Sequence, residues 1–147
     1  MDLIQHKKAR FDYEILEEFE AGIELIGLEV KSLRTSQAKL EGSHVIVRGG
    51  EAYVVGMVIS PYQPTNTPEG YDPNRVRKLL LTKKEIEELA KYEGQKGLTI
   101  VPISVYNKGR NLKMRVAVAR GRKKYDKREV IKKRETDIDI RRTLKRE

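Results

Sequence analysis

The sequence predicts a mainly β fold: a small closed antiparallel β-barrel with two or three short helices and a basic C-terminal tail. Three observations support this prediction. Short segments alternate between apolar and polar side chains, turn residues separate these segments, and the alternation stops after residue 119. We therefore expect one domain at residues 1–119 and a tail at residues 120–147. A barrel is favoured over a sandwich because closure removes exposed strand edges.

A short basic arm, residues 5–10, precedes the first apolar segment. Residues 11–28 alternate apolar and acidic side chains, and we interpret them as two half-buried strands that turn near Ala21 and Gly22. Near residue 26 the apolar spacing changes to four and then three residues, which is the period of one helical face. A short helix is therefore expected over one end of the sheet, with its two basic residues facing outward.

The clearest hairpin follows. Residues 44–48 alternate, Gly49 and Gly50 tolerate positive φ, and residues 52–59 are rich in valine. Residues 60–74 then contain four prolines and a glycine among polar side chains, so they are expected to form a loop. A loop of this length in a small domain is either functional or disordered.

One helix, residues 83–93, has a complete start signal. Thr82 is placed as its N-cap, and Glu85 three residues later completes a capping box. Gly94 is placed to end the helix. The residues expected on its buried face are Ile86, Leu89 and Ala90.

Two further strands, residues 98–106 and 112–119, are joined by residues 107–111, where Gly109 suits a turn. The total is about six strands and two helices. Short antiparallel strands of even length with helices at the ends favour an OB-like barrel. Such barrels commonly bind nucleic acid on one face, although a fold alone does not determine function.

The excess positive charge lies in the tail. The chain has a net charge of +9, and residues 120–147 hold 13 Lys or Arg against 6 Asp or Glu. A block this basic suits phosphate, and nucleic acid is favoured over a membrane because no broad apolar stripe accompanies the charge. Charged pairs four residues apart support a marginal helix, so we expect the tail to order on its partner.

Enzymatic chemistry has little support in the sequence. There is no cysteine, which excludes disulfides, zinc–thiolate clusters and thiol catalysis. His6 and His44 lack the carboxylate spacing of a metal site, and no phosphate-binding Gly-rich loop is present. No signal peptide or long apolar run is found, so a cytosolic protein without a cofactor is expected.

Two alternatives to an RNA adaptor remain open. Glu17, Glu18 and Glu20 could position a metal for nuclease chemistry, although a solvent-facing acidic edge explains them more simply. A structural ribosomal protein whose tail threads through rRNA is the other alternative.

Basic side chains in the body of the chain support RNA binding. With a barrel, they predict phosphate contacts for affinity and a few side chains for selection. Tyr125 in the tail suits either stacking on an unpaired base or anchoring the tail on the barrel. The basic residues are Lys7, Lys8, Arg10, Lys31, Arg34, Arg75, Arg77 and Lys78.

Five motifs lie in order along the chain. Together they resemble the tmRNA-binding small protein B family, also called SsrA-binding protein, over residues 6–135. Several motifs in register are more specific than any one of them. The motifs are Phe19-Glu20-Ala21-Gly22-Ile23, Glu29-Val30-Lys31-Ser32-Leu33-Arg34, Tyr71-Asp72-Pro73, Arg77-Lys78-Leu79-Leu80-Leu81 and Tyr125-Asp126-Lys127-Arg128.

This resemblance implies a non-enzymatic bacterial ribosome-rescue adaptor that acts in trans-translation. The barrel would bind the elbow of the tRNA-like domain of tmRNA. The tail, disordered when free and helical on the ribosome, would enter the empty mRNA channel of the stalled small subunit at the decoding region. The implied partners are tmRNA, the ribosome and the alanyl-tmRNA complex with elongation factor Tu, with no membrane and a monomeric protein.

The resemblance also implies site residues. Thr82 stands where the family often has an amide or an imidazole, and His6 stands where it usually has Asn. Tyr125 occupies the position of a ring that stacks on a decoding-centre base, which favours stacking over anchoring. The tmRNA-binding set is Lys7, Lys8, Arg10, Glu20, Lys31, Arg34, Arg77, Lys78, Leu80 and Thr82. The ribosome-binding set in the tail is Gly121, Lys123, Lys124, Tyr125, Asp126, Lys127, Arg128, Ile131, Lys132 and Arg134.

Overall fold

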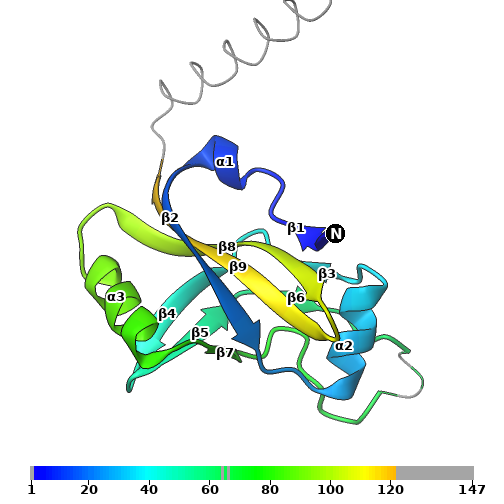
Figure 1. Cartoon of the computed structure of the whole chain (residues 1–147). Helices are drawn as coiled ribbons and strands as arrows, with labels where there is room; N and C mark the ends of the chain where they lie inside the picture. The colour runs from blue at the N-terminus through cyan, green and yellow to red at the C-terminus, as the bar shows by residue number, and fades with distance from the viewer. Residues whose placement is uncertain (1, 64, 66, 122–147) are drawn as a thin grey trace, which may run out of the picture.

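The computed structural model describes residues 2–63, 65 and 67–121 (Figure 1). Over these residues the chain is mainly β, with nine strands and three helices. The strands are β1 (Asp2–Gln5), β2 (Tyr13–Ile23), β3 (Ala38–Lys39), β4 (His44–Arg48), β5 (Glu51–Val55), β6 (Val58–Ile59), β7 (Arg77–Leu80), β8 (Leu98–Lys108) and β9 (Asn111–Gly121). The helices are α1 (Ala9–Asp12), α2 (Gly27–Arg34) and α3 (Lys83–Glu93). No helix in this described part is long and apolar enough to cross a membrane.

Seven strands form one antiparallel sheet in the order β1-β8-β9-β2-β7-β5-β4, and β3 pairs with β6 in a separate ribbon. The antiparallel prediction is confirmed. The predicted closure is not, because β1 and β4 are the two ends of this order and no pairing joins them among the described strands. β4 nevertheless lies against β8, so the sheet curls strongly. Figure 1 shows β2, β8 and β9 as the long strands that cross the molecule.

The prediction of two strands with a turn near Ala21 and Gly22 is wrong. Residues 13–23 form a single strand with no turn at Ala21 and Gly22, and the residues just before it form α1. Gly22 does not enter the positive-φ region. A Cβ at this position would lie 3.1 Å from the Leu80 Cβ on the neighbouring strand β7. The glycine is therefore explained by close packing between strands and not by a turn.

The central hairpin and the helix α2 are confirmed. β4 and β5 pair from His44 to Val55, and both Gly49 and Gly50 have positive φ. α2 spans Gly27–Arg34 over one end of the sheet, as the apolar spacing predicts. Prediction missed β1 and the short strand β3, because the arm and the polar stretch before β4 lack any alternation of apolar residues.

α3 is confirmed at both ends. The Thr82 Oγ1 accepts from the Glu85 backbone N at 3.2 Å, and the Thr82 backbone N donates to Glu85 Oε1 at 3.0 Å. These two bonds are the predicted capping box. Ile86 and Leu89 are buried, but Ala90 is exposed, so the buried face is narrower than predicted.

β8 and β9 are covered on both faces over part of their length. One face belongs to the main core with residues of β2, β5 and α3. On the other face, Ala9 of α1 packs against Val101, Ile103, Ala117 and Ala119. Helix α1 lies over this end of the sheet (Figure 1). The arm of residues 5–10 is therefore part of the folded body, which explains why residues 100–105 are buried without alternation.

β9 continues to Gly121, where it pairs with Tyr13 of β2. The predicted boundary between residues 119 and 120 thus falls inside a strand. Gly121, assigned above to the tail, is the last residue of the sheet. The predictions for the rest of the tail lie outside the described residues.

Candidate nucleic-acid interface

One face of the sheet is polar, and alternation along the strands determines which residues it contains. Glu20 on β2 is opposite Arg115 on β9, and Gly22 is opposite Leu80 on β7. Because side chains two residues apart share a face, these positions lie on the same side of the sheet. We call this side the outer face. Its members include Glu18, Glu20, Lys78, Leu80, Ser104, Tyr106, Lys108, Lys113 and Arg115.

Glu20 is the most strongly held side chain on the exposed part of this face. Its Oε2 accepts from Tyr106 Oη at 2.5 Å, and its Oε1 accepts from Lys108 Nζ at 2.9 Å. The hydrogen bond from Tyr106, followed by that from Lys108, lowers the pKa of the Glu20 carboxyl below its ordinary value. Burial, together with the bond to Glu20, raises the pKa of Tyr106 to about 12. Glu20 is therefore an ionised acceptor with a fixed orientation.

Leu80 on β7 packs over Gly22, two residues after Glu20 on the same face of β2, and is 53% exposed. An exposed leucine in a short strand offers an apolar contact to a base or a ribose. Thr82, two residues later, is exposed at the start of α3. The structure thus places Glu20 and Leu80 on the same face of neighbouring strands, and Thr82 follows Leu80 by two residues. Their role in binding tmRNA stays a prediction.

The prediction that Arg77 contacts RNA is wrong. Arg77 is fully buried, so it cannot contact RNA, and we remove it from the RNA-binding set. Its Nε and Nη2 donate to Glu29 Oε2 at 2.9 and 2.5 Å, its Nη1 donates to the Met57 carbonyl at 2.6 Å, and its Nη2 also reaches the Pro73 carbonyl at 3.0 Å. The guanidinium is used inside the protein to hold residues 57 and 73 against α2.

Glu29 on α2 is the centre of this buried cluster, which sequence reasoning did not predict. Its carboxylate also accepts from Arg75 Nη2, from Tyr71 Oη at 3.1 Å and from the Ile26 backbone N at 3.0 Å. Burial alone would raise the pKa of Glu29, but the hydrogen bonds from Arg75, Ile26 and Arg77 lower it below its ordinary value. The long loop after β6 is therefore anchored by ion pairs.

The other cations occupy several positions. Lys31 and Arg34 are exposed on α2, as predicted. Lys78 is half-buried, and its Nζ lies 3.5 Å from Glu51 Oε2. Lys78 shares strand β7 with Leu80, whereas Lys31 and Arg34 lie on α2, so these cations do not form one compact patch.

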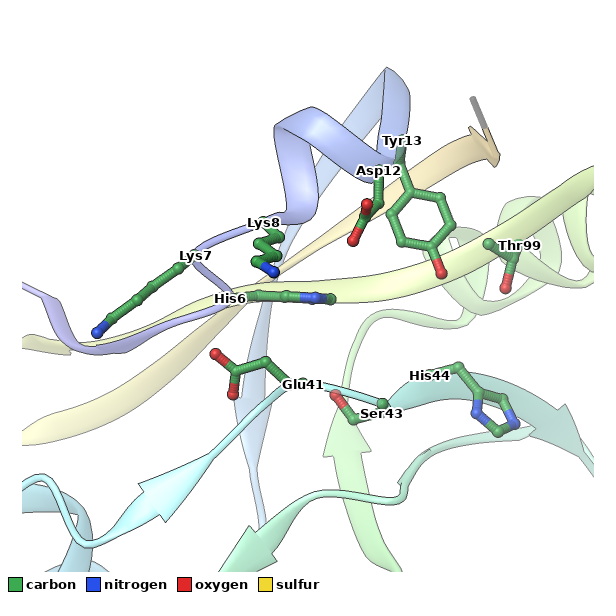
Figure 2. A pocket seen from close by; sticks show the side chains of 10 residues that line it. His6, Lys7, Lys8, Asp12, Tyr13, Glu41, Ser43, His44 and Thr99 are labelled. Atoms are coloured by element: carbon green, nitrogen blue, oxygen red, sulfur yellow. The ribbon is translucent and has the colours of Figure 1, made fainter. Parts of the chain in front are cut away.

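The arm and Tyr13, the first residue of β2, line a pocket (Figure 2). Glu20 lies towards the other end of this strand. The pocket has a volume of about 590 Å³. Figure 2 shows His6 and Tyr13 on the arm side facing Glu41 and Ser43 across the gap. The His6 and Tyr13 rings meet edge to face, with centroids 6.5 Å apart. Lys7 and Lys8 also line it, whereas the Arg10 side chain lies outside the described residues.

The arm and Glu20 therefore form two separate regions. Tyr13 and Glu20 are seven residues apart on one strand, which is about 23 Å at roughly 3.3 Å per residue. Arg115, Tyr106 and Lys108 were missed by the sequence reasoning. The alternation of residues 112–119, which was used to predict a strand, also places Arg115 on the face of the sheet that includes Glu20.

The acidic cluster does not form a metal site. The Glu17 carboxylate accepts from Tyr92 Oη on α3 at 2.6 Å, on the opposite side of β2 from Glu20. Glu18 lies 4.0 Å from Arg115. Because these carboxylates have separate partners and do not converge, the nuclease alternative has no support in the geometry.

A mainly antiparallel sheet, a polar face that combines cations with a fixed carboxylate, and a strongly basic C-terminal segment define a nucleic-acid-binding protein of the β class. Comparison with known proteins gives the family. The family model described as SmpB protein matches residues 3–146. The chain belongs to this family.

The relatives that we compared and a solved structure support the same family assignment. An SsrA-binding protein of Gloeothece citriformis is 44% identical over 144 residues, which cover 98% of this chain and 93% of the relative. One from Streptococcus equi subsp. zooepidemicus is 47% identical over 143 residues, covering 97% and 92%. A solved structure described as "tmRNA-SmpB: a journey to the center of the bacterial ribosome" matches with a TM-score of 0.70 and 41% identity, covering 87% of this chain and 93% of that chain.

Proposed function

We propose that this protein is a non-enzymatic RNA-binding adaptor that binds the tRNA-like domain of tmRNA and delivers it to stalled ribosomes in trans-translation. The observation that carries the proposal is the match over nearly the whole chain to SsrA-binding proteins and to a solved tmRNA–SmpB structure. The outer face carries both an oriented carboxylate, that of Glu20, and an exposed leucine, Leu80, and is a suitable surface for recognising RNA outside a regular duplex.

The finer architecture belongs to the same proposal. We describe the curled sheet as an OB-like barrel, because β4 lies against β8 although the two strands do not pair. The tmRNA-binding surface comprises Glu20, Leu80 and Thr82 with the cations of the arm, α2 and β7, without Arg77. The body ends at residue 121, and the basic segment that follows is the ribosome-binding part.

The division of labour follows from this arrangement. The body binds tmRNA, and the basic segment enters the mRNA channel at the decoding region of the small subunit. We expect a cytoplasmic monomer that joins alanyl-tmRNA and elongation factor Tu before it reaches the ribosome. Affinity comes mainly from phosphate contacts and selection from the outer face.

The test separates body from tail with two variants of the full chain. Glu20→Gln keeps the side-chain shape and removes the charge, so we expect about tenfold weaker binding to a tRNA-like tmRNA fragment, since hydrogen bonds to charged groups are worth about 1.5–3 kcal/mol. A triple change of Asp126, Lys127 and Arg128 to alanine should leave this binding intact and abolish peptide tagging in a reconstituted translation reaction.

The control is an unrelated RNA duplex of equal length, across a salt series. The wild-type chain should prefer the tmRNA fragment at every salt concentration. Equal binding of both RNAs would contradict the proposed function and favour a generic basic-tail binder. Loss of tmRNA binding in the triple variant would contradict the division between body and tail.

A further inference from the structure

A second, smaller pocket lies between the arm and the outer face of the sheet. Its volume is about 240 Å³. Gln5, His6 and Lys7 line it from the arm side, and Ser104 and Arg115 line it from β8 and β9. Asp2 also lines it, and the Asp2 carboxylate accepts from the Gln5 amide at 2.8 Å. The pocket therefore lies between the two regions that the proposed function leaves separate.

Two polar atoms in the pocket wall lack partners. Ser104 is 2% exposed, and its Oγ has no hydrogen-bond partner among the described residues. The buried Nδ1 of His6 likewise has none within this part of the chain. Leaving a buried hydroxyl unpaired is destabilising, so such a group calls for an explanation. A ligand that accepts a hydrogen bond would satisfy the Ser104 hydroxyl.

The charges of the pocket favour an anion. Lys7 and Arg115 contribute two cations, and the Ser104 hydroxyl can donate a third hydrogen bond. Arg115 Nε also lies 4.0 Å from Glu18 Oε2, but this pair is exposed, so a phosphate can replace it at small cost. The one carboxylate in the wall, that of Asp2, already accepts from Gln5. A guanidinium, an ammonium and a hydroxyl around one small cavity match a phosphate group better than a neutral ligand.

Arg115 connects this pocket to Glu20. Its guanidinium carbon lies 5.3 Å from the centre of the Tyr106 ring, and Tyr106 donates to Glu20. A phosphate held by Arg115 would therefore lie next to the aromatic ring and the carboxylate. One nucleotide could then contact the pocket through its backbone while its neighbour contacts Glu20.

We propose that this pocket binds a backbone phosphate of the RNA, with Arg115 and Lys7 as the cationic contacts and Ser104 as a hydroxyl donor. The proposal rests on the proposed function and adds Arg115 and Ser104, which the sequence did not identify, to the predicted contact Lys7. It makes the outer face continuous from the arm to Glu20, so the RNA backbone follows the strands β8 and β9.

The test compares full-length variants in binding to the tRNA-like tmRNA fragment over a salt series. Arg115→Gln should weaken binding about tenfold and reduce the salt slope by about 0.7 to 0.9, as expected for the loss of one phosphate contact. The control, Arg48→Gln, removes the same charge at a position where Arg48 pairs with Glu93, away from this face. It should leave the slope unchanged.

Ser104→Ala separates a binding role from a structural one. Because its hydroxyl has no partner among the described residues, removing it should leave the melting temperature unchanged or raise it, while RNA binding weakens about threefold. A fall in melting temperature with unchanged RNA binding would show that the hydroxyl is structural and would overturn the proposal.

The remaining outcomes distinguish this inference from the proposed function. If the wild-type chain prefers the tmRNA fragment but Arg115→Gln retains its affinity and slope, the pocket proposal is wrong and the function stands. If the wild-type chain shows no preference, both fail. An NMR titration with inorganic phosphate tests the other source of the ligand. Amide shifts at Ser104 and Arg115 together with unchanged RNA binding by Arg115→Gln would assign the pocket to free phosphate and overturn the proposal.

Discussion

Glu29 and Glu20 have similar partners but different surroundings. Each carboxylate accepts from a tyrosine hydroxyl and from at least one basic side chain. Glu29 and Arg77 are both fully buried, whereas the side chain of Glu20 is 38% exposed. Each set of hydrogen bonds lowers the pKa of its glutamate, so both are ionised at neutral pH. The two glutamates differ in whether water can replace a hydrogen-bond partner of the carboxylate: it can at Glu20 but not at Glu29.

This difference determines what each cluster can do. A buried ion pair that loses one partner leaves an uncompensated charge in a dry site, so the cluster around Glu29 is committed to the fold. An exposed pair loses little when one partner leaves, because water takes its place. The cluster around Glu20 can therefore exchange Lys108 or part of its hydration for groups on RNA at small cost. The same chemical groups serve stability in one place and recognition in the other.

The largest expected effect comes from breaking the buried pair. Arg77→Leu leaves Glu29 buried with fewer donors, and we expect the free energy of unfolding to fall by about 3–5 kcal/mol. Urea denaturation of the full chain measures this. The double change Glu29→Leu with Arg77→Leu should recover part of the loss, because it removes the uncompensated charge. A loss below about 1 kcal/mol for the single change would mean that the cluster does not hold the fold.

Lowering the pH should also weaken the cluster around Glu29, in this case without replacing any side chain. The folded-state pKa of Glu29 lies below the ordinary value of 4.5. Its stabilising contribution is therefore present above about pH 4.5 and is lost as the pH falls towards the folded-state pKa. We expect the melting temperature of the wild-type chain to fall more steeply below about pH 5 than that of Glu29→Gln. Parallel curves for the two chains would contradict this assignment.

Thr82 is an intermediate case, because it caps α3 and is also a proposed RNA contact. Thr82→Ala removes the acceptor for the Glu85 backbone N and should cost about 1 kcal/mol of stability. Thr82→Ser retains the cap and serves as the control. If Thr82 contacts RNA through its hydroxyl, Thr82→Ala should weaken tmRNA binding and Thr82→Ser should not. Equal stability of wild type and Thr82→Ala in thermal unfolding would rule out the capping role.

Local signals in the sequence were sufficient for several elements. Thr82 with Glu85 predicted both the start of α3 and its hydrogen bonds, and the paired glycines predicted the hairpin of β4 and β5. These features depend on residues close together in the chain. Glu20 and Leu80 were placed by resemblance, and strand pairing put them together.

Contacts between residues far apart in the chain could not be predicted from such local signals. Gly22 was predicted as a turn residue because the sequence does not show that Leu80 of another strand lies over it. Arg77 reads as a solvated cation because Glu29, its partner, is far away in the sequence. The burial of Ser104 depends on the arm folding back over β8, which no local pattern indicates. Such errors are the expected result of reading burial from alternation alone.

The smallest expected effect on stability is at Tyr106, where a matched control is available. Tyr106→Phe removes the hydroxyl that orients Glu20, and Tyr92→Phe removes the hydroxyl that donates to Glu17 at 2.6 Å. Glu20 is exposed and Glu17 is half-buried, so neither hydroxyl lies in a dry site, and both variants should melt within about 2 °C of the wild type. Only Tyr106→Phe should weaken binding to the tRNA-like fragment, by about threefold.

A double-variant cycle shows whether Tyr106 acts through Glu20. If Tyr106 only orients the carboxylate, Tyr106→Phe should have no further effect on RNA binding once Glu20→Gln is present. Additive losses would mean that the tyrosine contacts RNA by itself. An equal loss in Tyr92→Phe would mean that the outer face has no special role, and the contrast between a buried structural glutamate and an exposed binding glutamate would no longer hold.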